Sequence, residues 1–217
     1  MSGSLAAVAL VAACAYHGGH GMAHDFSDVD TWVAAFDDPT RGEWQKPEHV
    51  VALMEIAPGA TVVDLGAGTG YFLPYLARAV GAEGKVLALD AEPNLVDHMT
   101  KRAAEEGLAN VEARVVAPDD PGLAAGSVDR VLIVDTWHHI PDRAVYARRL
   151  AAALKPGGRI LVVDFTPESD RGPAPEHKLS AEAVVAELVA GGLEARALAE
   201  ELPDQYVVEA RLPQPAD

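Results

Sequence analysis

Apolar residues in this chain form short continuous runs that alternate with segments of helical spacing. Apolar runs at 62–64, 86–90 and 159–165 predict strands, and the continuous run within 129–135 predicts a strand buried on both faces. The mixed segment 110–117 is expected to be the third strand along the chain. Between them apolar residues recur at helical spacing, as at Leu95 and Met99 in the helix expected over 92–107. With two more strands expected near the C-terminus, this alternation predicts an α/β fold: a doubly wound, mostly parallel seven-stranded sheet with helices on both faces.

The first strand runs into a glycine-rich loop, VVDLGAGTGYF at 62–72. Glycines at 66, 68 and 70 allow a tight turn into a helix, and they let a ligand approach the backbone closely. A dinucleotide-binding fingerprint would need glycine at position 71, where this chain has Tyr71. The Gly-Lys-Ser/Thr of a P-loop is also absent, so the ligand belongs to another class.

The loop, with Asp64 two residues before Gly66, resembles motif I of the class I S-adenosylmethionine-dependent methyltransferases. Asp90 ends the next apolar strand, where Rossmann-like sheets place the carboxylate that binds ribose hydroxyls. The string LKPGG at 154–158 adds to a resemblance that covers 26–212. It implies a Rossmann-like fold and S-adenosylmethionine as cofactor, held by Asp64, Gly66, Gly68, Gly70 and Asp90. It also implies an acid after the third strand that binds adenine, for which Asp119 or Asp120 is the candidate.

The fourth strand ends in the polar string DTWHH at 135–139. Ligands of open α/β sheets bind outside the carboxyl ends of the strands, so Asp135, His138 and His139 are expected to face the methyl acceptor. Asp135 or one histidine would be the general base for an oxygen or nitrogen acceptor. Adjacent side chains on an irregular segment diverge, so one histidine is expected to be structural.

Two other segments are expected near the site. Residues 44–46 (Trp-Gln-Lys) precede the first strand, a region that folds over the cofactor in the resembled family. The polar loop 166–178 carries His177 and is expected to face the substrate.

Charge narrows the class of acceptor. The net charge of −16 and the pI near 4.8 argue against binding a nucleic-acid backbone, which requires clustered Lys and Arg. A small-molecule acceptor is therefore expected. The single cysteine, Cys14, excludes an internal disulfide and a multi-thiolate zinc site.

The N-terminal sequence predicts that the chain consists of a separate segment at 1–24 and one methyltransferase domain at 25–217. The apolar run 5–13 has the length of a signal-peptide core, and Val-Ala-Ala-Cys14 resembles a bacterial lipobox. A lipid on Cys14 would attach the protein to a membrane of the cell envelope. No Lys or Arg precedes Arg41, however, so the alternative is a cytoplasmic protein with an exposed or packed N-terminal helix and an incidental cysteine. His17, His20 and His24 either bind a metal or belong to a flexible tether.

The strings DTxHH, GPxPEHK and LPxQY resemble a group of bacterial methyltransferases with lipoprotein-like N-termini. That group usually has tyrosine where this chain has Trp137. The competing hypothesis is a non-catalytic envelope lipoprotein that binds a cofactor or a metal on the same fold. Turnover of labelled methyl groups separates the two hypotheses, because a binding protein only shifts its melting temperature with ligand.

Overall fold

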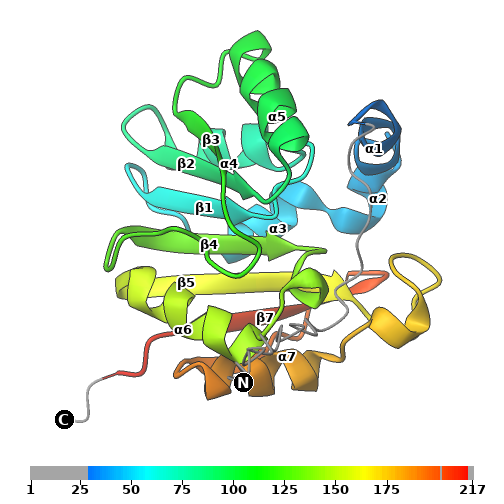
Figure 1. Ribbon diagram of the computed structural model, residues 1–217, viewed down its shortest axis with the longest axis vertical. Helices are drawn as coiled ribbons and strands as arrows, with labels where there is room; N and C mark the ends of the chain where they lie inside the picture. The colour runs from blue at the N-terminus through cyan, green and yellow to red at the C-terminus, as the bar shows by residue number, and fades with distance from the viewer. Residues whose placement is uncertain (1–28, 201, 215–217) are drawn as a thin grey trace, which may run out of the picture.

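A mixed seven-stranded sheet crosses the centre of the molecule, in the order β3-β2-β1-β4-β5-β7-β6 (Figure 1). The computed structural model describes residues 29–200 and 202–214. The strands are β1 (Thr61–Leu65), β2 (Lys85–Asp90), β3 (Val111–Val115), β4 (Val128–Val134), β5 (Leu154–Phe165), β6 (Glu194–Ala197) and β7 (Gln205–Arg211). The helices are α1 (Val29–Phe36), α2 (Arg41–Gln45), α3 (Pro47–Leu53), α4 (Leu73–Val80), α5 (Pro93–Glu105), α6 (Arg143–Ala153) and α7 (Ala181–Ala190), with 3-10 turns η1 (Trp137–His139) and η2 (Pro175–His177).

The strand directions confirm the predicted Rossmann-like, mostly parallel sheet. Strands β1 to β5 pair in parallel, whereas β7 runs antiparallel to β5 and β6 antiparallel to β7. The chain moves outward from β1 to β3 and then returns to add β4 on the other side of β1. Such a reversal opens a crevice at the carboxyl ends of the two central strands.

Two apolar layers hold the helices against the sheet. On one face α3, α4 and α5 pack with residues such as Leu76 and Met99, and on the other α6 and α7 pack with residues such as Leu150 and Leu188. Most residues of β1, β2, β4 and β5 are buried, which explains why their sequences are nearly continuous apolar runs. Leu95 and Met99 are both buried, as their spacing predicts.

Two elements differ from the prediction. Helix α2 (Arg41–Gln45) was not expected; it is a single turn of five residues, too short to show an apolar period. Strand β5 begins at Leu154 and not at Arg159, because Leu154 pairs with Val128 of β4. The LKPGG string therefore lies within the strand as an irregularity between two paired segments, with Gly157 at a φ of +78°.

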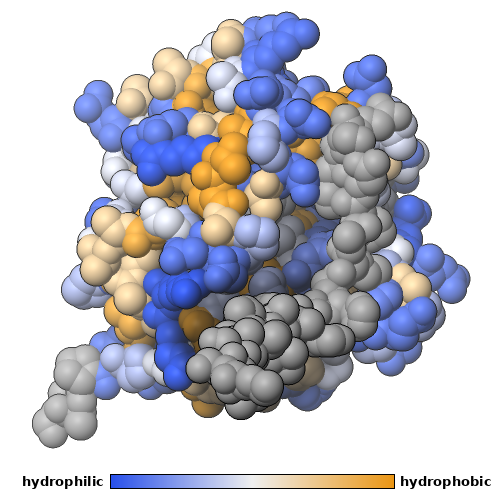
Figure 2. Space-filling view, in the orientation of Figure 1, coloured by the Kyte–Doolittle hydropathy of each residue, from blue (hydrophilic) through white to orange (hydrophobic). Residues whose placement is uncertain are grey.

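Two segments cover the carboxyl ends of the parallel strands, at the right of Figure 1. They are the helices α1 and α2, which we call the lid (residues 29–45), and the loop 166–178 that follows β5. Hydrophilic side chains dominate the outer surface of this loop and the exposed end of α5 (Figure 2). These two covers define where a ligand meets the sheet.

In the described part of the chain, no helix combines the length and the apolar composition needed to cross a bilayer. The predicted lipobox at Cys14, the tether histidines His17, His20 and His24, and the domain boundary after residue 24 lie outside the described residues, and they stay predictions.

Candidate active site

A cavity of about 630 Å³ follows the carboxyl ends of β3, β2, β1 and β4, where the crevice was expected. The lid and the loop 166–178 contribute its outer wall. The residues that line it include Trp32, Phe36, Arg41, Trp44, Asp64, Gly66, Gly68, Tyr71, Asp90, Val116, Pro118, Asp135, Thr136, His138, His139, Tyr146, Phe165 and Arg171. This volume lies within the range of small-molecule and cofactor sites.

The glycine loop reaches the cavity through two of its three glycines. Gly66 has a φ of +68°, and a Cβ atom there would lie 2.2 Å from the methyl carbon of Thr136. Gly68 has a φ of +59°, and its Cβ would lie 3.5 Å from the ring of Phe36 on the lid. Gly70 instead faces Leu73 and Met99, where a Cβ would be 2.6 Å from Leu73. The structure thus places Gly66 and Gly68 in the cavity wall and Gly70 in the packing below α4.

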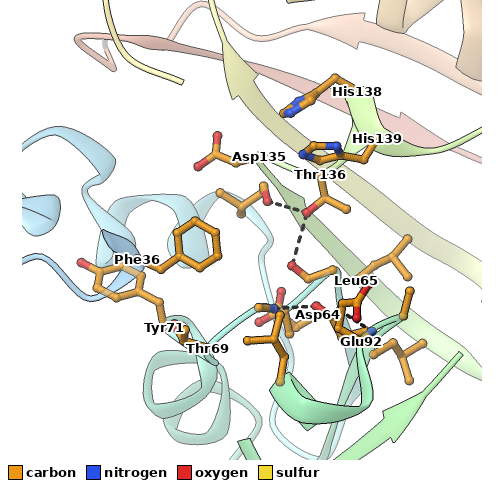
Figure 3. Close-up of a pocket in the computed structure, with 18 of the residues that line it drawn as sticks. Phe36, Asp64, Leu65, Thr69, Tyr71, Glu92, Asp135, Thr136, His138 and His139 are labelled. Carbon is orange, nitrogen blue, oxygen red and sulfur yellow. Dashed lines mark hydrogen bonds between the residues drawn. The ribbon is translucent and has the colours of Figure 1, made fainter. Parts of the chain in front are cut away.

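Asp90 stands at the end of β2 with both carboxylate oxygens held by backbone. Oδ2 accepts a hydrogen bond from the N–H of Gly68 at 2.8 Å, and Oδ1 accepts one from Glu92 at 3.0 Å (Figure 3). Burial raises the pKa of Asp90, and the two N–H groups oppose that shift. Each oxygen keeps a second lone pair, so the carboxylate can still accept hydrogen bonds from ribose hydroxyls.

Asp64, which pairs with Ala88 of β2, has an unpaired oxygen. Its side chain is 3% exposed, and among the described residues no group donates a hydrogen bond to Oδ2. Burial raises the pKa of Asp64 to about 7, while the charge of Arg41 works against the rise. A buried carboxylate oxygen without a donor indicates a missing partner. The ammonium group of the methionine part of S-adenosylmethionine has the right charge for it.

Asp119 does not reach the cavity, contrary to the prediction that it binds adenine. Its side chain is 70% exposed and lies 3.9 Å from Arg149 of α6, and Asp120 lies 3.8 Å from the same arginine. A bridge between Ala117 and Asp120 turns the chain away after β3. Apolar Val116 and Pro118 line this end of the cavity instead. With this correction, the wall from Pro118 past Asp90 to Asp64 fits S-adenosylmethionine.

The segment after β4 brings its three predicted residues together. Asp135 has a φ of +52°, which is uncommon for a residue other than glycine and reverses the chain into η1. His138 and His139 both line the cavity, and their ring centroids are 4.2 Å apart. Figure 3 shows the two imidazoles side by side next to Thr136. The expectation that they diverge was wrong, because the tight 3-10 turn brings the two rings into contact, with their planes tilted by 44°.

Asp164 is a candidate site residue that was not predicted from the sequence. It lies near the end of β5, is 2% exposed, and its two oxygens are 3.0 and 2.9 Å from Nδ1 of His138. Asp64, Asp90 and Asp135 also follow apolar runs, so the same position at the end of 159–165 was a usable signal.

Arg41 is a second missed residue, and it lies on the lid. Its guanidinium is 11% exposed, with Nη2 3.8 Å from an oxygen of Asp135 and Cζ 4.2 Å from the ring centroid of Tyr71. Burial lowers the pKa of Arg41, and Asp135 opposes this shift. Burial and the neighbouring Asp164 raise the pKa of Asp135 in turn. The local sequence does not mark Arg41 as a site residue, because its ion-pair partner Asp135 lies 94 positions later in the chain.

The two predicted covers reach the site through particular residues. Trp44 lines the cavity, with its ring centroid 5.8 Å from that of Phe165, whereas Gln45 is fully buried beside it. The loop 166–178 reaches the cavity through Arg171, which is held by Asp204 at 3.0 Å. His177 is not among the residues that line the cavity in the described structure.

Replacing Asp90 by alanine is expected to weaken cofactor binding by about tenfold to a hundredfold, because charge-assisted hydrogen bonds to ribose hydroxyls are lost. Titration calorimetry with S-adenosylhomocysteine measures the dissociation constant. Asp97→Ala, an exposed change on α5, is the matched control and leaves the constant unchanged. An unchanged constant in Asp90→Ala would mean that another acid, such as the neighbouring Glu92, holds the ribose.

Comparison with known proteins agrees with this geometry. Residues 62–158 match the sequence model of a methyltransferase domain family. The crystal structure of a SAM-dependent methyltransferase from Aquifex aeolicus is 30% identical, with a TM-score of 0.79 over 87% of this chain and 98% of that one.

Two curated relatives are O-methyltransferases. Nocamycin O-methyltransferase of Saccharothrix syringae is 34% identical over 130 residues, which are 59% of this chain and 46% of the relative. The ubiquinone biosynthesis O-methyltransferase of Xanthomonas axonopodis pv. citri is 37% identical over 116 residues, 53% of this chain and 46% of the relative. The chain thus spans about half the length of the curated relatives it matches.

Proposed function

The chain belongs to the class I S-adenosylmethionine-dependent methyltransferases, and from this premise we propose that it methylates a hydroxyl oxygen of a small organic molecule. The observation that carries the proposal is the pair of His138 and Asp164 beside the cofactor cavity. The pair supplies the general base that a hydroxyl acceptor needs in order to lose its proton.

Asp164 determines which nitrogen of His138 is free to act as that base. The two side chains are 3% and 4% exposed, so the pair is shielded from water. A carboxylate only accepts hydrogen bonds, so Nδ1 of His138 carries the ring hydrogen. Nε2 then keeps its lone pair, and an imidazolium formed at His138 is stabilised by the charge of Asp164.

Methyl transfer needs little else from the protein. S-adenosylmethionine supplies a methyl group on a sulfonium, from which sulfur leaves readily. The acceptor oxygen forms a bond to the methyl carbon, the carbon–sulfur electron pair returns to sulfur, and Nε2 of His138 takes the hydroxyl proton. The lid and the loop 166–178 contribute by excluding water and holding the two reactants in line.

The walls of the cavity support a small acceptor with an apolar or aromatic body. Trp44, Phe165 and Tyr146 line it together with Trp32 and Phe36 of the lid. The cavity must hold the cofactor and the reacting part of the acceptor in about 630 Å³, which suits a small acceptor. The two curated relatives are named as O-methyltransferases, of nocamycin and in ubiquinone biosynthesis, which favours the same class of reaction here.

The proposal is tested by incubating the protein with S-adenosylmethionine labelled in its methyl group and four matched sets of acceptors. The sets carry hydroxyl, amino, thiol or carboxyl groups on the same aromatic and aliphatic frames. Label in the hydroxyl set, with S-adenosylhomocysteine formed in equal amount, supports O-methylation. Transfer confined to the amino, thiol or carboxyl sets would contradict it.

Affinity for S-adenosylhomocysteine is expected to rise with pH until about pH 7 and then to level off. The ammonium of the ligand needs the ionised form of Asp64, whose pKa burial raises to about 7. Below that value binding must first release a proton, so the affinity falls by up to about tenfold per pH unit. Calorimetry across this range measures the slope, and Asp64→Asn is expected to remove it. A slope that persists in Asp64→Asn would place the titrating group elsewhere.

A further inference from the structure

Four polar side chains form a ring where the lid meets the sheet. Nε of Arg41 donates to Oε1 of Gln45 at 2.9 Å, and Nε2 of Gln45 donates to Oε1 of Gln205 at 2.5 Å. Nε2 of Gln205 donates to Oδ1 of Asp135, also at 2.5 Å. The other oxygen of Asp135 lies 3.8 Å from Nη2 of Arg41, which closes the ring.

The charges of Arg41 and Asp135 fix the direction of the hydrogen bonds that run between them through the two glutamines. A guanidinium only donates hydrogen bonds and a carboxylate only accepts them, so each amide between them has a single satisfied orientation. Gln45 is 0% exposed and Gln205 is 2% exposed. Buried amides that lose a partner are costly, and members of such a network depend on one another. The ring is therefore expected to be made or broken as a unit.

The ring joins parts of the chain that are distant in sequence. Arg41 and Gln45 belong to α2, Gln205 begins β7, and Asp135 follows β4, so the bond between the two glutamines spans 160 positions. Arg41 also donates to the backbone oxygen of Phe36 at 2.7 Å. Through this bond the ring holds the end of α1, whose Phe36 ring faces Gly68 of the glycine loop.

We propose that Gln45 and Gln205 are positioning residues that latch the lid over the cofactor cavity and, by the same bonds, orient the carboxylate of Asp135. Neither glutamine is among the residues that line the cavity in the described chain, so they act through Arg41, Phe36 and Asp135. Opening the lid for cofactor exchange breaks the Gln45–Gln205 bond and releases Asp135. This proposal rests on the assignment of the cavity to the cofactor. It does not depend on which acceptor is methylated.

The first test is the rate at which S-adenosylhomocysteine leaves the protein, followed by stopped-flow fluorescence of the lid tryptophans. Gln45→Leu and Gln205→Leu are each expected to raise this rate by about tenfold, since each removes the bond between the two glutamines together with one neighbouring bond of the ring. The double variant is expected to be no faster than either single variant, because either change alone already breaks the ring as a unit. Gln214→Leu, an exposed change outside the ring, leaves the rate unchanged.

The second test measures the pKa of Asp135 by a carbon-13 NMR titration of its carboxyl group. The charged and titratable groups near Asp135 are Arg41 of α2, Asp164 of β5, His138 of η1 and Tyr206 of β7, and all stay in place in the variant. Gln205→Leu is expected to raise the pKa of Asp135, because the lost N–H stabilises the ionised form. Gln205→Glu, of nearly the same shape, is expected to raise it further by adding a negative charge.

These measurements separate a latch from simple packing. Variants that melt at lower temperature but keep both the wild-type dissociation rate and the wild-type titration of Asp135 would overturn the proposal. So would a double variant whose rate is the product of the two single effects. Failure of the wild type to bind S-adenosylhomocysteine would instead contradict the cofactor assignment, which is a distinct outcome.

Discussion

Replacing His138 by alanine is expected to lower the rate of methyl transfer to a hydroxyl acceptor by about 10² to 10⁴-fold, the usual effect of losing a proton-transfer group. The imidazole lines the cavity and is oriented by Asp164 at 2.9 Å. In the described structure its hydrogen bonds go to Asp164 and not to the glycine loop or Asp90, so affinity for S-adenosylhomocysteine is expected to stay unchanged. Turnover of labelled methyl groups per folded molecule, together with calorimetry, measures both quantities.

Asp164→Asn provides a companion variant that keeps the size of the side chain but removes its charge. It is expected to lower turnover as well, and the double variant is expected to be no worse than His138→Ala, because the two residues act as a unit. His98→Ala on α5, outside the cavity wall, is the matched control. If both site variants keep wild-type turnover, the base is not His138, and Asp135 and His139 become the residues to test.

Replacing Gly68 by leucine is expected to abolish detectable binding of S-adenosylmethionine, a loss of at least about a hundredfold. The φ of +59° at Gly68 is strained for any residue with a Cβ, and the side chain would enter the cavity toward Phe36. The change would also disturb the N–H that Gly68 donates to Asp90. In Gly68→Leu the cofactor is therefore expected to lose both its close approach to the loop and its contact with Asp90.

Gly126→Leu is the control for backbone strain, because Gly126 has the same φ of +59° and a Cβ there would meet nothing within 4 Å. Both variants carry a similar left-handed strain of about 1–2 kcal/mol. Only Gly68→Leu is expected to lose the cofactor while its melting temperature falls by no more than that of Gly126→Leu. If Gly68→Leu binds the cofactor normally, the ligand does not approach the loop at Gly68.

The aspartates at the carboxyl ends of the strands show which parts of this site the sequence indicated and which only the structure revealed. Asp64, Asp90 and Asp135 each follow an apolar run, and in the structure all three line one cavity. Asp164 follows the same rule in β5, yet it escaped notice because no glycine loop or histidine stands beside it in sequence. Asp119, a candidate for binding adenine through the family resemblance alone, is exposed instead, since a turn after Ala117 directs it toward Arg149.

The order of strands and helices was readable from the amino-acid sequence because those preferences are local. Parallel strands covered on both faces require continuous apolar residues, and a tight turn from β1 into α4 requires glycine where φ is positive. These requirements appear within about ten consecutive residues. The fold class, the cofactor loop and Asp90 at the end of β2 therefore followed from pattern and spacing.

Contacts between distant segments had no such local signature. Whether His138 or His139 meets a carboxylate depends on where β5 places Asp164, and the orientation of Asp135 depends on Gln205, 70 positions later in the chain. Arg41 and Gln45 lie on a helix of one turn, whose position is set by bonds to β7 and to the end of β4. Such long-range hydrogen bonds arise only when the sheet has brought its strand ends together, because no residue near them in sequence supplies the partner.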